Sequence, residues 1–494
     1  MTPSRPIIIG AGIGGLCAAL DLAIAGHRPI VIERQHQIGG KMVPVTVAGG
    51  SVDGGPTVLT MLWVFEALFK SAGVRLRDVL DLAPAERLAR HFWLDGSRLD
   101  LFADLDRSFQ AIKALAGPDE ADGFIRYHAY AKRIFDNVDD VFINAPKPTV
   151  WRVMNRLGLK AIPKLMRIDA QRSMWRALET FFQDERLRQL FGRYATYAGN
   201  NPFLTPATFN LIAHVEQLGV WRVGGGMHAL AKIIGELIES RGGEIMLNTD
   251  VNQIEVQDKS VTAIHLADGR RLTTSAVIFN GDVSALGLGL FGKDIARHMR
   301  ATSVKDRSLS AVTFCCRAQV GTFPLIHHNV FFSTNYRHEF EQIEKLGQVP
   351  DEPTVYICAQ DREDDDTPRE SDRLLVLINA PATGDISPHD ESALLQLETR
   401  TRTYLARMGL ILSPNAVLRR GPAEWHGLFP GTGGAIYGAA AKTWNATLKR
   451  KGSTSSIKGL YLAGGSVHPG AGVPMAALSG RMAASRALAD CPSM

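Results

Sequence analysis

The first 33 residues hold the feature that most constrains the fold of this chain, a glycine-rich turn between two short apolar runs. The run PIII at residues 6–9 is typical of a buried parallel strand, and the turn GAGIGG follows it at once. A helical period then extends from about residue 14 to residue 25, and Gly26 lies where the C′ residue of a helix is expected. The next apolar run, PIVIE, ends at Glu33. The sequence therefore predicts a complete β-turn-α-β unit at the N-terminus.

The spacing of the glycines predicts that this turn binds a dinucleotide. Gly10, Gly12 and Gly15 form the pattern G-x-G-x-x-G, which allows a tight turn, a close approach to a pyrophosphate and close helix–strand packing. The helix N-terminus attracts phosphate groups, and Glu33 is placed to bind the hydroxyls of a ribose. The acid favours NAD or FAD over NADP. A chance glycine-rich turn and, for residues 6–26, a signal peptide are the alternatives, and the glycine spacing and the following strand disfavour both.

A second glycine pair follows the acid closely. The segment ERQHQIGGK places Arg34, Gly39, Gly40 and Lys41 just beyond Glu33, which suggests a backbone packed along a long cofactor. A solvated basic face is the alternative role for Arg34 and Lys41. This extended pattern resembles the FAD-binding signature of the flavin amine oxidase and phytoene desaturase superfamily, so we expect FAD as the cofactor.

Residues 52–65, VDGGPTVLTMLWVF, add a rigid and open turn. The glycines, proline and threonine of this turn leave backbone donors free, and the run that follows is unusually apolar. This run is either a buried helix that begins near Thr60 or a wall against flavin and an apolar ligand. For Trp63 and Phe65, packing in the core is the favoured role.

Almost at the end of the chain, residues 463–481 show a strand-like entry, a glycine-rich turn and an Ala-rich helical stretch. Too few residues follow to complete a second nucleotide domain. In the superfamily that the N-terminus resembles, such a segment completes the FAD-binding domain. Pro474 has a plausible N1 position in the helix, with Met475 in the first turn. The N-terminus of this helix is expected to face the flavin and to stabilise the negative charge that builds up on reduction.

Composition and charge narrow the class of protein. The chain has 494 residues, of which 45% are hydrophobic and 21% charged, as expected for a soluble globular protein of two or three domains. The net charge of +5 is too small to argue for nucleic-acid binding. No apolar run reaches the roughly 18–20 residues that span a bilayer. The five cysteines have no metal-binding spacing, so we expect reduced, mostly buried thiols and no metal.

The chain resembles the phytoene desaturase family of carotenoid oxidoreductases over nearly its whole length. The motifs that carry the resemblance are GAGIGGLCAALDLAIAG…VIER…GGK, DGGPTVLT, RVGGGMHALA, LADGRRL…AVIFNGD and YLAGGSVHPGAGVPMAALSGR. The stretches GPTVLTMLWVF, GRYATYAGNNPF and HHNVFFSTNYRHEF resemble one branch, the 1-hydroxycarotenoid (methoxyneurosporene) 3,4-desaturases. The resemblance implies FAD contacts at Gly10, Gly12, Gly14, Gly15, Glu33, Arg34, Gly40, Lys41, Gly55, Pro56, Thr57, Val251, Gly464, Gly465, Pro474 and Met475.

The resemblance also implies an α/β fold in three parts: a discontinuous Rossmann-like FAD-binding domain, an α+β substrate domain and a helical membrane-associating region. We expect the FAD-binding domain in residues 1–70, 209–300 and 456–494. A mostly helical substrate and membrane-associating region is expected over residues 71–208, and the sheet of the substrate domain over residues 301–455.

The family's chemistry is the removal of two hydrogens from a carbon–carbon bond of a long acyclic carotenoid, by hydride transfer to flavin N5. In the resembled branch this bond is C3–C4, next to a hydroxylated or methoxylated end. Oxygen or a quinone is the expected electron acceptor. The alternatives are a phytoene or neurosporene desaturase, a carotenoid ketolase or isomerase and, from a different class, a non-redox lipid escort protein of the same fold.

The segment WRVMNRLGLKAIPKLMR, residues 151–167, predicts contact with a membrane. Basic residues recur every four positions among apolar ones, which is typical of a helix lying at an anionic bilayer surface, and Pro163 would kink it. A surface helix packed on its own domain is the alternative. We expect a cytoplasmic protein peripherally associated with the inner face of a membrane.

No spacing in the sequence identifies a catalytic base. His468 is the candidate nearest to the C-terminal motif, although a structural role for it is favoured. Weaker candidates, to which nothing local assigns a role, are His228, Trp425, His426, Asp53 and Arg193.

Overall fold

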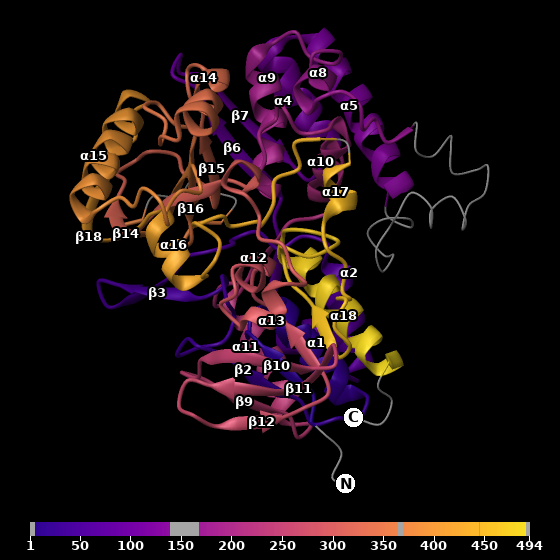
Figure 1. The fold of residues 1–494 in the computed structure, drawn as a ribbon. Coiled ribbons are helices and arrows are strands. Elements are labelled where there is room, and N and C mark those ends of the chain that lie inside the picture. Colours follow the sequence, from indigo (N-terminus) through magenta and orange to yellow (C-terminus); the bar gives the residue numbers. More distant parts are fainter. Residues whose placement is uncertain (1–4, 139–166, 364–368, 444, 491–494) are drawn as a thin grey trace.

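Three lobes make up the molecule in the computed structural model, which describes residues 5–138, 167–363, 369–443 and 445–490. A lower lobe is built around a parallel sheet, one upper lobe around a larger sheet, and the other upper lobe from helices (Figure 1). Residues 151–166 of the basic segment lie outside the described residues.

The sheet of the lower lobe takes its five strands from widely separated parts of the chain. Its strands, all parallel and in the spatial order β19-β13-β1-β2-β9, are β1 (Ile7–Ile9), β2 (Ile30–Ile32), β9 (Glu244–Met246), β13 (Val277–Phe279) and β19 (Leu460–Leu462). Each central strand is apolar on both faces, as a parallel sheet covered on both sides requires. Ile8 packs with the helices on one side, whereas Ile7 and Ile9 pack with the small sheet on the other.

Helices cover one face of this sheet and a ribbon of strands covers the other. The helices are α1 (Ile13–Ile24), α2 (Leu62–Ser71), α11 (His228–Glu239) and α18 (Val473–Asp490). The antiparallel ribbon is β10 (Val251–Gln257), β11 (Ser260–Leu266) and β12 (Arg271–Thr273). The helix expected near Thr60 begins at Leu62. Core packing is confirmed for Phe65, which is fully buried, and is wrong for Trp63, which is 40% exposed.

The larger sheet has seven strands in the order β18-β14-β17-β16-β15-β6-β7. They are β6 (Arg87–Phe92), β7 (Arg98–Phe102), β14 (Ser310–Gln319), β15 (His328–Phe331), β16 (Val355–Ala359), β17 (Asp372–Ala380) and β18 (Ser413–Arg420). All neighbours are antiparallel except β15 and β6. The hairpin of β6 and β7 extends this sheet from within a region that was expected to be mostly helical. Helix α15 (Glu391–Arg407) packs against the sheet through Leu394, Leu397 and Leu405.

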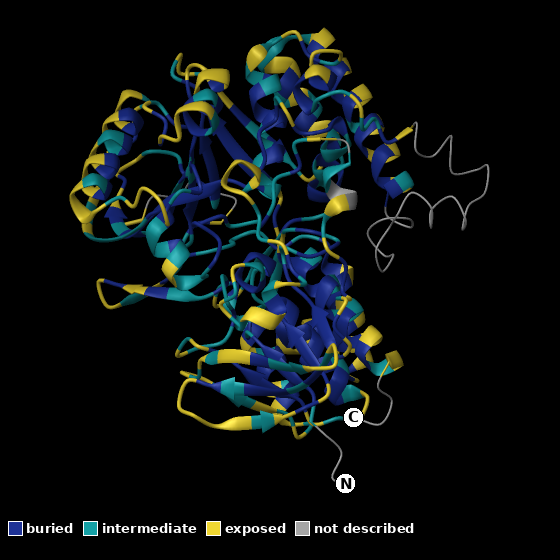
Figure 2. Cartoon of the chain, viewed as in Figure 1, coloured by how far each residue is buried: buried dark blue, intermediate teal, exposed yellow. Residues whose placement is uncertain are grey.

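Aromatic rings gather around Phe191 in the helical lobe: Phe124 and Phe182 stack on it, and Tyr127 packs at a tilt. Its elements are α4 (Leu105–Ala116), α5 (Pro118–Val138), α8 (Met174–Leu178), α9 (Glu185–Gly192), η3 (Arg193–Ala198), η4 (Ala207–Asn210) and α10 (Leu211–Gln217). Buried residues line the inner sides of these helices and the strands of both sheets (Figure 2). Among the described helices none combines the length and the apolar character needed to cross a membrane.

Shorter elements connect the lobes. The two-stranded ribbons are β3 (Pro44–Val47) with β4 (Gly50–Asp53), and β5 (Leu82–Pro84) with β8 (Trp221–Val223). The remaining helical segments are α3 (Leu76–Val79), α12 (Val283–Gly287), α13 (Lys293–Ala296), η5 (Val304–Asp306), α14 (Tyr336–Glu341), η6 (Gln342–Leu346), α16 (Pro422–Leu428) and α17 (Ala446–Lys449).

Candidate active site

The glycine turn after β1 leaves the N-terminus of α1 open to an anion. Gly10 has φ +98°, a conformation that favours glycine, and a Cβ at Gly15 would lie 2.1 Å from the carbonyl oxygen of Gly10. Helix α1 begins without a side-chain cap at Gly12 and without an acidic residue in its first turn. Its first backbone N–H groups therefore lack the side-chain partners that usually satisfy a helix start, which is the arrangement that binds phosphate.

Glu33 lies beside this turn at the end of β2. One carboxylate oxygen accepts a hydrogen bond from the backbone N–H of Ala11 (2.7 Å) and the other from that of Gln35 (2.9 Å). Burial, which leaves the residue 6% exposed, raises the pKa of Glu33. The backbone N–H of Thr249 donates to the Glu33 carbonyl (2.9 Å), which brings the segment that precedes Val251 to the same place.

The second glycine pair packs directly onto the first turn. A Cβ at Gly40 would lie 2.9 Å from the Cα of Gly12, and a Cβ at Gly55 would lie 1.8 Å from the carbonyl oxygen of Lys41. The turn that contains Pro56 and Thr57 thus continues the same surface. Neither position has room for a side chain.

Arg34 and Lys41 lie in different environments. Arg34 is exposed and pairs with Asp250 at 3.5 Å, which matches the solvated alternative. Lys41 points inward: its Nζ donates to the carbonyl of Ile436 (2.5 Å) and lies 5.0 Å from the centre of the Phe429 ring.

The C-terminal segment closes on the N-terminal turn. A Cβ at Gly14 would lie 3.1 Å from the backbone nitrogen of Gly464 and 2.9 Å from the carbonyl oxygen of Ala476. Helix α18 begins at Val473, so Pro474 is its second residue and not its first. Proline still costs no hydrogen bond there, because the first four N–H groups of a helix have no partner within the helix.

Asn280 joins these segments, and sequence reasoning missed it. It follows β13 directly, and its side-chain amide donates to the carbonyl of Gly10 (3.1 Å). Its side-chain oxygen would lie 2.6 Å from a Cβ at Gly14 and 3.0 Å from one at Gly464. The signal that could have found it is the polar triplet NGD immediately after a buried strand.

The charges around the turn fit FAD. Lys41 and Arg450 are both largely buried, and burial lowers the pKa of each, to about 10 for Arg450. The hydrogen bonds of Arg450 go only to carbonyls, those of Tyr437, Ala439 and Gly465. A buried cation is costly without an anionic partner. The charge of Asp282 offsets part of this cost for both residues, and a pyrophosphate at the open start of α1 would add further negative charge.

A polar cluster lies beside the Thr57 turn. The Thr57 hydroxyl lies 2.7 Å from that of Tyr356, which in turn lies 2.8 Å from Nδ1 of His328. Burial, and after it the neighbouring His327 and Arg193, hold the pKa of His328 well below its usual range, so this ring is neutral. Of these residues, the sequence predicts Thr57 as an FAD contact and Arg193 as a weak catalytic candidate. Sequence reasoning missed Tyr356, His327 and His328.

The other histidine and aspartate candidates have hydrogen-bond partners within the protein, whereas the indole N–H of Trp425 is buried without one among the described residues. Asp53 accepts from the backbone N–H of Met227 (2.9 Å), and Nε2 of His228 lies 3.1 Å from the Ile38 carbonyl. His426 accepts from the backbone N–H of Gly433 (3.0 Å), and the neighbouring Trp425 is buried. His468 is 6% exposed, and its backbone N–H donates to the Lys451 carbonyl (2.8 Å). A catalytic role for His468 stays a prediction.

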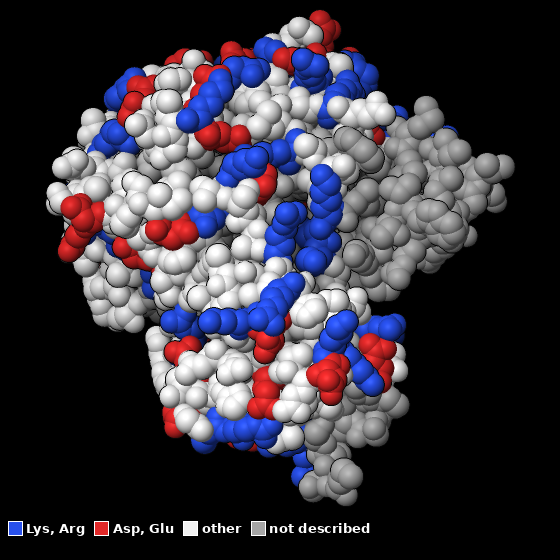
Figure 3. Space-filling model, in the orientation of Figure 1, with Lys and Arg blue, Asp and Glu red and all other residues white. Residues whose placement is uncertain are grey.

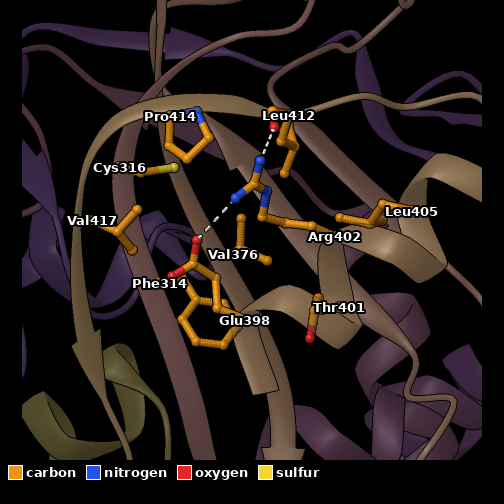
Figure 4. Close-up of a pocket in the computed structure, with 10 residues that line it drawn as sticks. All are labelled: Phe314, Cys316, Val376, Glu398, Thr401, Arg402, Leu405, Leu412, Pro414 and Val417. Atoms are coloured by element: carbon orange, nitrogen blue, oxygen red, sulfur yellow. Dashed lines mark hydrogen bonds and ion pairs between the residues drawn. The ribbon is translucent and has the colours of Figure 1, made fainter. Parts of the chain in front are cut away.

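Two other features of the described residues lie outside the cofactor turn. His327, His328 and Cys358 place possible metal-ligating atoms within 4.8 Å of one another, and Nε2 of His328 is buried without a hydrogen-bond partner in the described part of the chain. Nε2 of His327 lies 3.5 Å from Sγ of Cys358, and its Nδ1 donates to the Arg362 carbonyl (2.9 Å). The cavity between α15 and the seven-stranded sheet holds about 10 Å³, room for one water molecule (Figure 4).

Comparisons with known proteins agree with this geometry. The family model described as flavin containing amine oxidoreductase matches residues 13–488. A hydroxyneurosporene desaturase of Rubrivivax gelatinosus is 44% identical over 99% of this chain and 94% of its own length, and one of Rhodobacter capsulatus is 42% identical over 98% and 97%. A phytoene desaturase (lycopene-forming) of Pseudescherichia vulneris is 30% identical over 98% and 99%.

Solved structures share the fold at low identity. An oxidoreductase from Methanosarcina mazei superposes with a TM-score of 0.62 at 15% identity, covering 97% of this chain and 99% of that one. Cyclohexylamine oxidase from Brevibacterium oxydans gives a TM-score of 0.60 at 15% identity, covering 99% and 100%. Gly14, Gly15, Glu33 and the C-terminal closure lie within residues 13–488, and the chain belongs to the flavin-containing amine oxidoreductase family.

Proposed function

We propose that this oxidoreductase uses FAD to introduce the C3–C4 double bond into an acyclic 1-hydroxy- or methoxy-carotenoid during carotenoid biosynthesis. The observation that carries the proposal is 44% identity over nearly the whole of both chains to a hydroxyneurosporene desaturase. Similarity of this extent includes the upper sheet and the helical lobe, not the cofactor motifs alone.

Residues that would hold FAD come from three segments of the chain. The pyrophosphate would be bound by the turn Gly10–Gly12–Gly14–Gly15, by Gly464 and Gly465, and by the charges of Lys41 and Arg450. Glu33 would bind the ribose. Further contacts would come from Arg34, Gly40, Gly55, Pro56, Thr57, Val251, Pro474 and Met475. Bound there, FAD supplies a two-electron acceptor that takes up a hydride from a C–H bond.

The sheet topology supports a division of the chain into an FAD-binding part and a substrate-binding part. We assign residues 1–70, 209–300 and 456–494 to a Rossmann-like FAD-binding domain, because together they supply all five strands of the parallel sheet. Residues 71–208 and 301–455 would form the substrate-binding part, with β6 and β7 contributing to its sheet. The substrate would then lie where the upper lobes meet the Thr57 turn.

The proposed function includes contact of the protein with a membrane. A carotenoid is delivered from a bilayer, and residues 151–167 would provide a basic interfacial helix on its cytoplasmic side. Lys and Arg side chains also gather around α17, in the middle of the face shown in Figure 3. Such a distribution suits an anionic surface. Oxygen or a membrane quinone would accept the electrons.

The test supplies 1-hydroxyneurosporene, neurosporene and phytoene, each in liposomes, to purified protein reconstituted with FAD. We expect flavin absorbance in the purified protein and 3,4-desaturation of the hydroxylated carotenoid, identified by the red shift of its spectrum and a mass loss of two hydrogens. Desaturation of phytoene alone would show that the branch is wrong. Gain of oxygen would indicate a ketolase, and protein without flavin would favour a lipid escort.

A further inference from the structure

One group of polar side chains lies where all three lobes meet, and we call it the Arg193 cluster. Thr57 comes from the cofactor lobe, Arg193 and Tyr197 come from η3 in the helical lobe, and His328 and Tyr356 come from β15 and β16 of the upper sheet. The Tyr356 hydroxyl connects Thr57 (2.7 Å) with His328 (2.8 Å). The guanidinium of Arg193 lies over the ring of Tyr356, 5.3 Å from its centre.

The charge of Arg193 has no direct anionic partner among the described residues. Nη1 donates one hydrogen bond, to the hydroxyl of Tyr197 (3.1 Å), and the guanidinium lies 5.1 Å from the centre of that ring. The carboxylate of Glu216 connects to it only through Tyr197, whose hydroxyl donates to Glu216 at 2.9 Å. An arginine has five N–H donors and is always charged, so most of its donors are left without a protein acceptor.

These unused donors are held in place and remain accessible. Arg193, Tyr197, Tyr356 and Thr57 are each only partly buried, although they lie between lobes. Nε and Nη2 of Arg193 have no hydrogen-bond partner among the described residues, and both retain some surface exposed to solvent. The rings of Tyr197 and Tyr356 fix the plane of the guanidinium by cation–π contact. These N–H donors are therefore available to a hydrogen-bond acceptor from outside the chain.

The position of the cluster indicates what that acceptor is. Thr57 belongs to the turn that packs, through Gly55, against Lys41 of the proposed FAD site. The oxygen at C1 of an oxygenated carotenoid is separated from the reacting C3 only by C1 and C2, so it must lie close to the flavin. A methoxy oxygen can only accept a hydrogen bond, and a guanidinium can only donate one. One arginine therefore suits both a hydroxyl and a methoxy end.

Building on the proposed function, we propose that Arg193 donates a hydrogen bond to the C1 oxygen of the carotenoid and selects oxygenated substrates over hydrocarbon ones. Tyr197 and Tyr356 are positioning residues that hold the guanidinium and present apolar ring faces to the polyene. A hydrocarbon end would leave this cation without an acceptor, and a site built to pair a polar group rejects the analogue that lacks it.

The experiment compares variants of the FAD-loaded enzyme on 1-hydroxyneurosporene and neurosporene in liposomes. The variants are Arg193→Met, which keeps the length but removes the charge, Arg193→Lys, which keeps the charge, and Tyr356→Leu, which removes the ring beneath the guanidinium. The matched control is Arg107→Met, because Arg107 also lies over an aromatic ring, that of Phe102 at 4.1 Å, but is exposed on α4. Binding is measured separately from turnover, by quenching of tryptophan fluorescence under anaerobic conditions with the flavin already reduced.

A charged hydrogen bond of this kind corresponds to about a tenfold to hundredfold change in affinity. We expect Arg193→Met to lower the affinity and kcat/KM for 1-hydroxyneurosporene by that factor. The values for neurosporene should stay the same or rise, because the cation that a hydrocarbon end leaves unpaired is gone. Arg193→Lys should keep part of the preference for 1-hydroxyneurosporene over neurosporene. Arg107→Met should show none of these changes. FAD content should equal that of the wild type in all four.

The outcomes separate this proposal from the proposed function. A wild-type enzyme that desaturates no oxygenated carotenoid overturns the proposed function. A wild-type enzyme that prefers 1-hydroxyneurosporene, with the same preference in Arg193→Met, overturns the role of Arg193 alone. If Arg193→Met loses its FAD or its fold, Tyr356→Leu replaces it in the test. An unchanged substrate preference in Tyr356→Leu overturns the proposed role of the Arg193 cluster.

Discussion

Replacing Gly480 by alanine tests whether the two ends of the chain form one cofactor site. Helices α1 and α18 make an extensive contact and come closest where Gly480 faces Gly14. A Cβ at Gly480 would lie 1.9 Å from the carbonyl oxygen and 2.7 Å from the carbonyl carbon of Gly14. Real Cβ atoms essentially never come within 3.0 Å of such atoms, so the helices must separate by about 1 Å. Both contacts are with backbone, and no side chain can rotate away.

Two opposing contributions set the change in the free energy of unfolding. Overpacking in a close contact costs about 1–3 kcal/mol, and a rigid backbone partner places this case near 3 kcal/mol. Alanine in a helix interior gains about 1 kcal/mol over glycine. The net expectation for Gly480→Ala is a loss of about 2 kcal/mol in the free energy of unfolding. Because Gly14 belongs to the turn proposed to bind the pyrophosphate, FAD affinity should fall as well.

Urea unfolding followed by circular dichroism, and FAD release followed by flavin fluorescence, measure the two effects. The matched control is Gly427→Ala in α16, where an added Cβ meets nothing within 4 Å, and this variant should be unchanged or slightly more stable. A Gly480→Ala protein with the wild-type urea midpoint and FAD content would refute the close contact of α1 and α18.

Two further predictions concern charge and protonation. Replacing Glu33 by glutamine should raise the Kd for FAD about tenfold or more in calorimetry, because a charge-assisted hydrogen bond to the ribose is weakened, and an unchanged Kd would contradict its role. Burial, and after it the charge of Arg193, lowers the pKa of His91 to about 3. As pH falls from about 6.5 towards 3, only the unfolded state takes up this proton, so stability should fall by about 1.4 kcal/mol per pH unit. The pH dependence of Tm between pH 5 and 7 should be shallower in His91→Gln than in the wild type, and identical slopes would contradict this assignment.

The part of the fold that depends on local spacing could be predicted from the sequence. The glycine pattern, the two short strands and Glu33 lie within 33 residues, and each is specified by its immediate neighbours. The closure of the C-terminal segment onto the N-terminal turn followed from the resemblance, and the contact between Gly464 and Gly14 is of the kind it implied. Helix starts were less certain, as the beginning of α18 at Val473 illustrates.

Long-range pairing could not be predicted in the same way. The hairpin of β6 and β7 was visible as a local pattern, but nothing in it indicates that β6 pairs in parallel with β15, more than 200 residues later. The Arg193 cluster has the same origin, because Thr57, Arg193 and Tyr356 meet only after three lobes have packed together. Spacing along the chain carries no information on such contacts.

Asn280 and Thr57 show how the cofactor and the substrate parts depend on each other. Asn280 occupies the point at which Gly10, Gly14 and Gly464 converge, so the turn proposed for the pyrophosphate needs the first, middle and last segments together. The same surface continues through Gly55 to Thr57, whose hydroxyl contacts Tyr356 of the upper sheet. A shift of this turn would move the cofactor contacts and the Arg193 cluster together. On the proposed function, selection of the substrate and position of the flavin would therefore be coupled through a few residues of backbone.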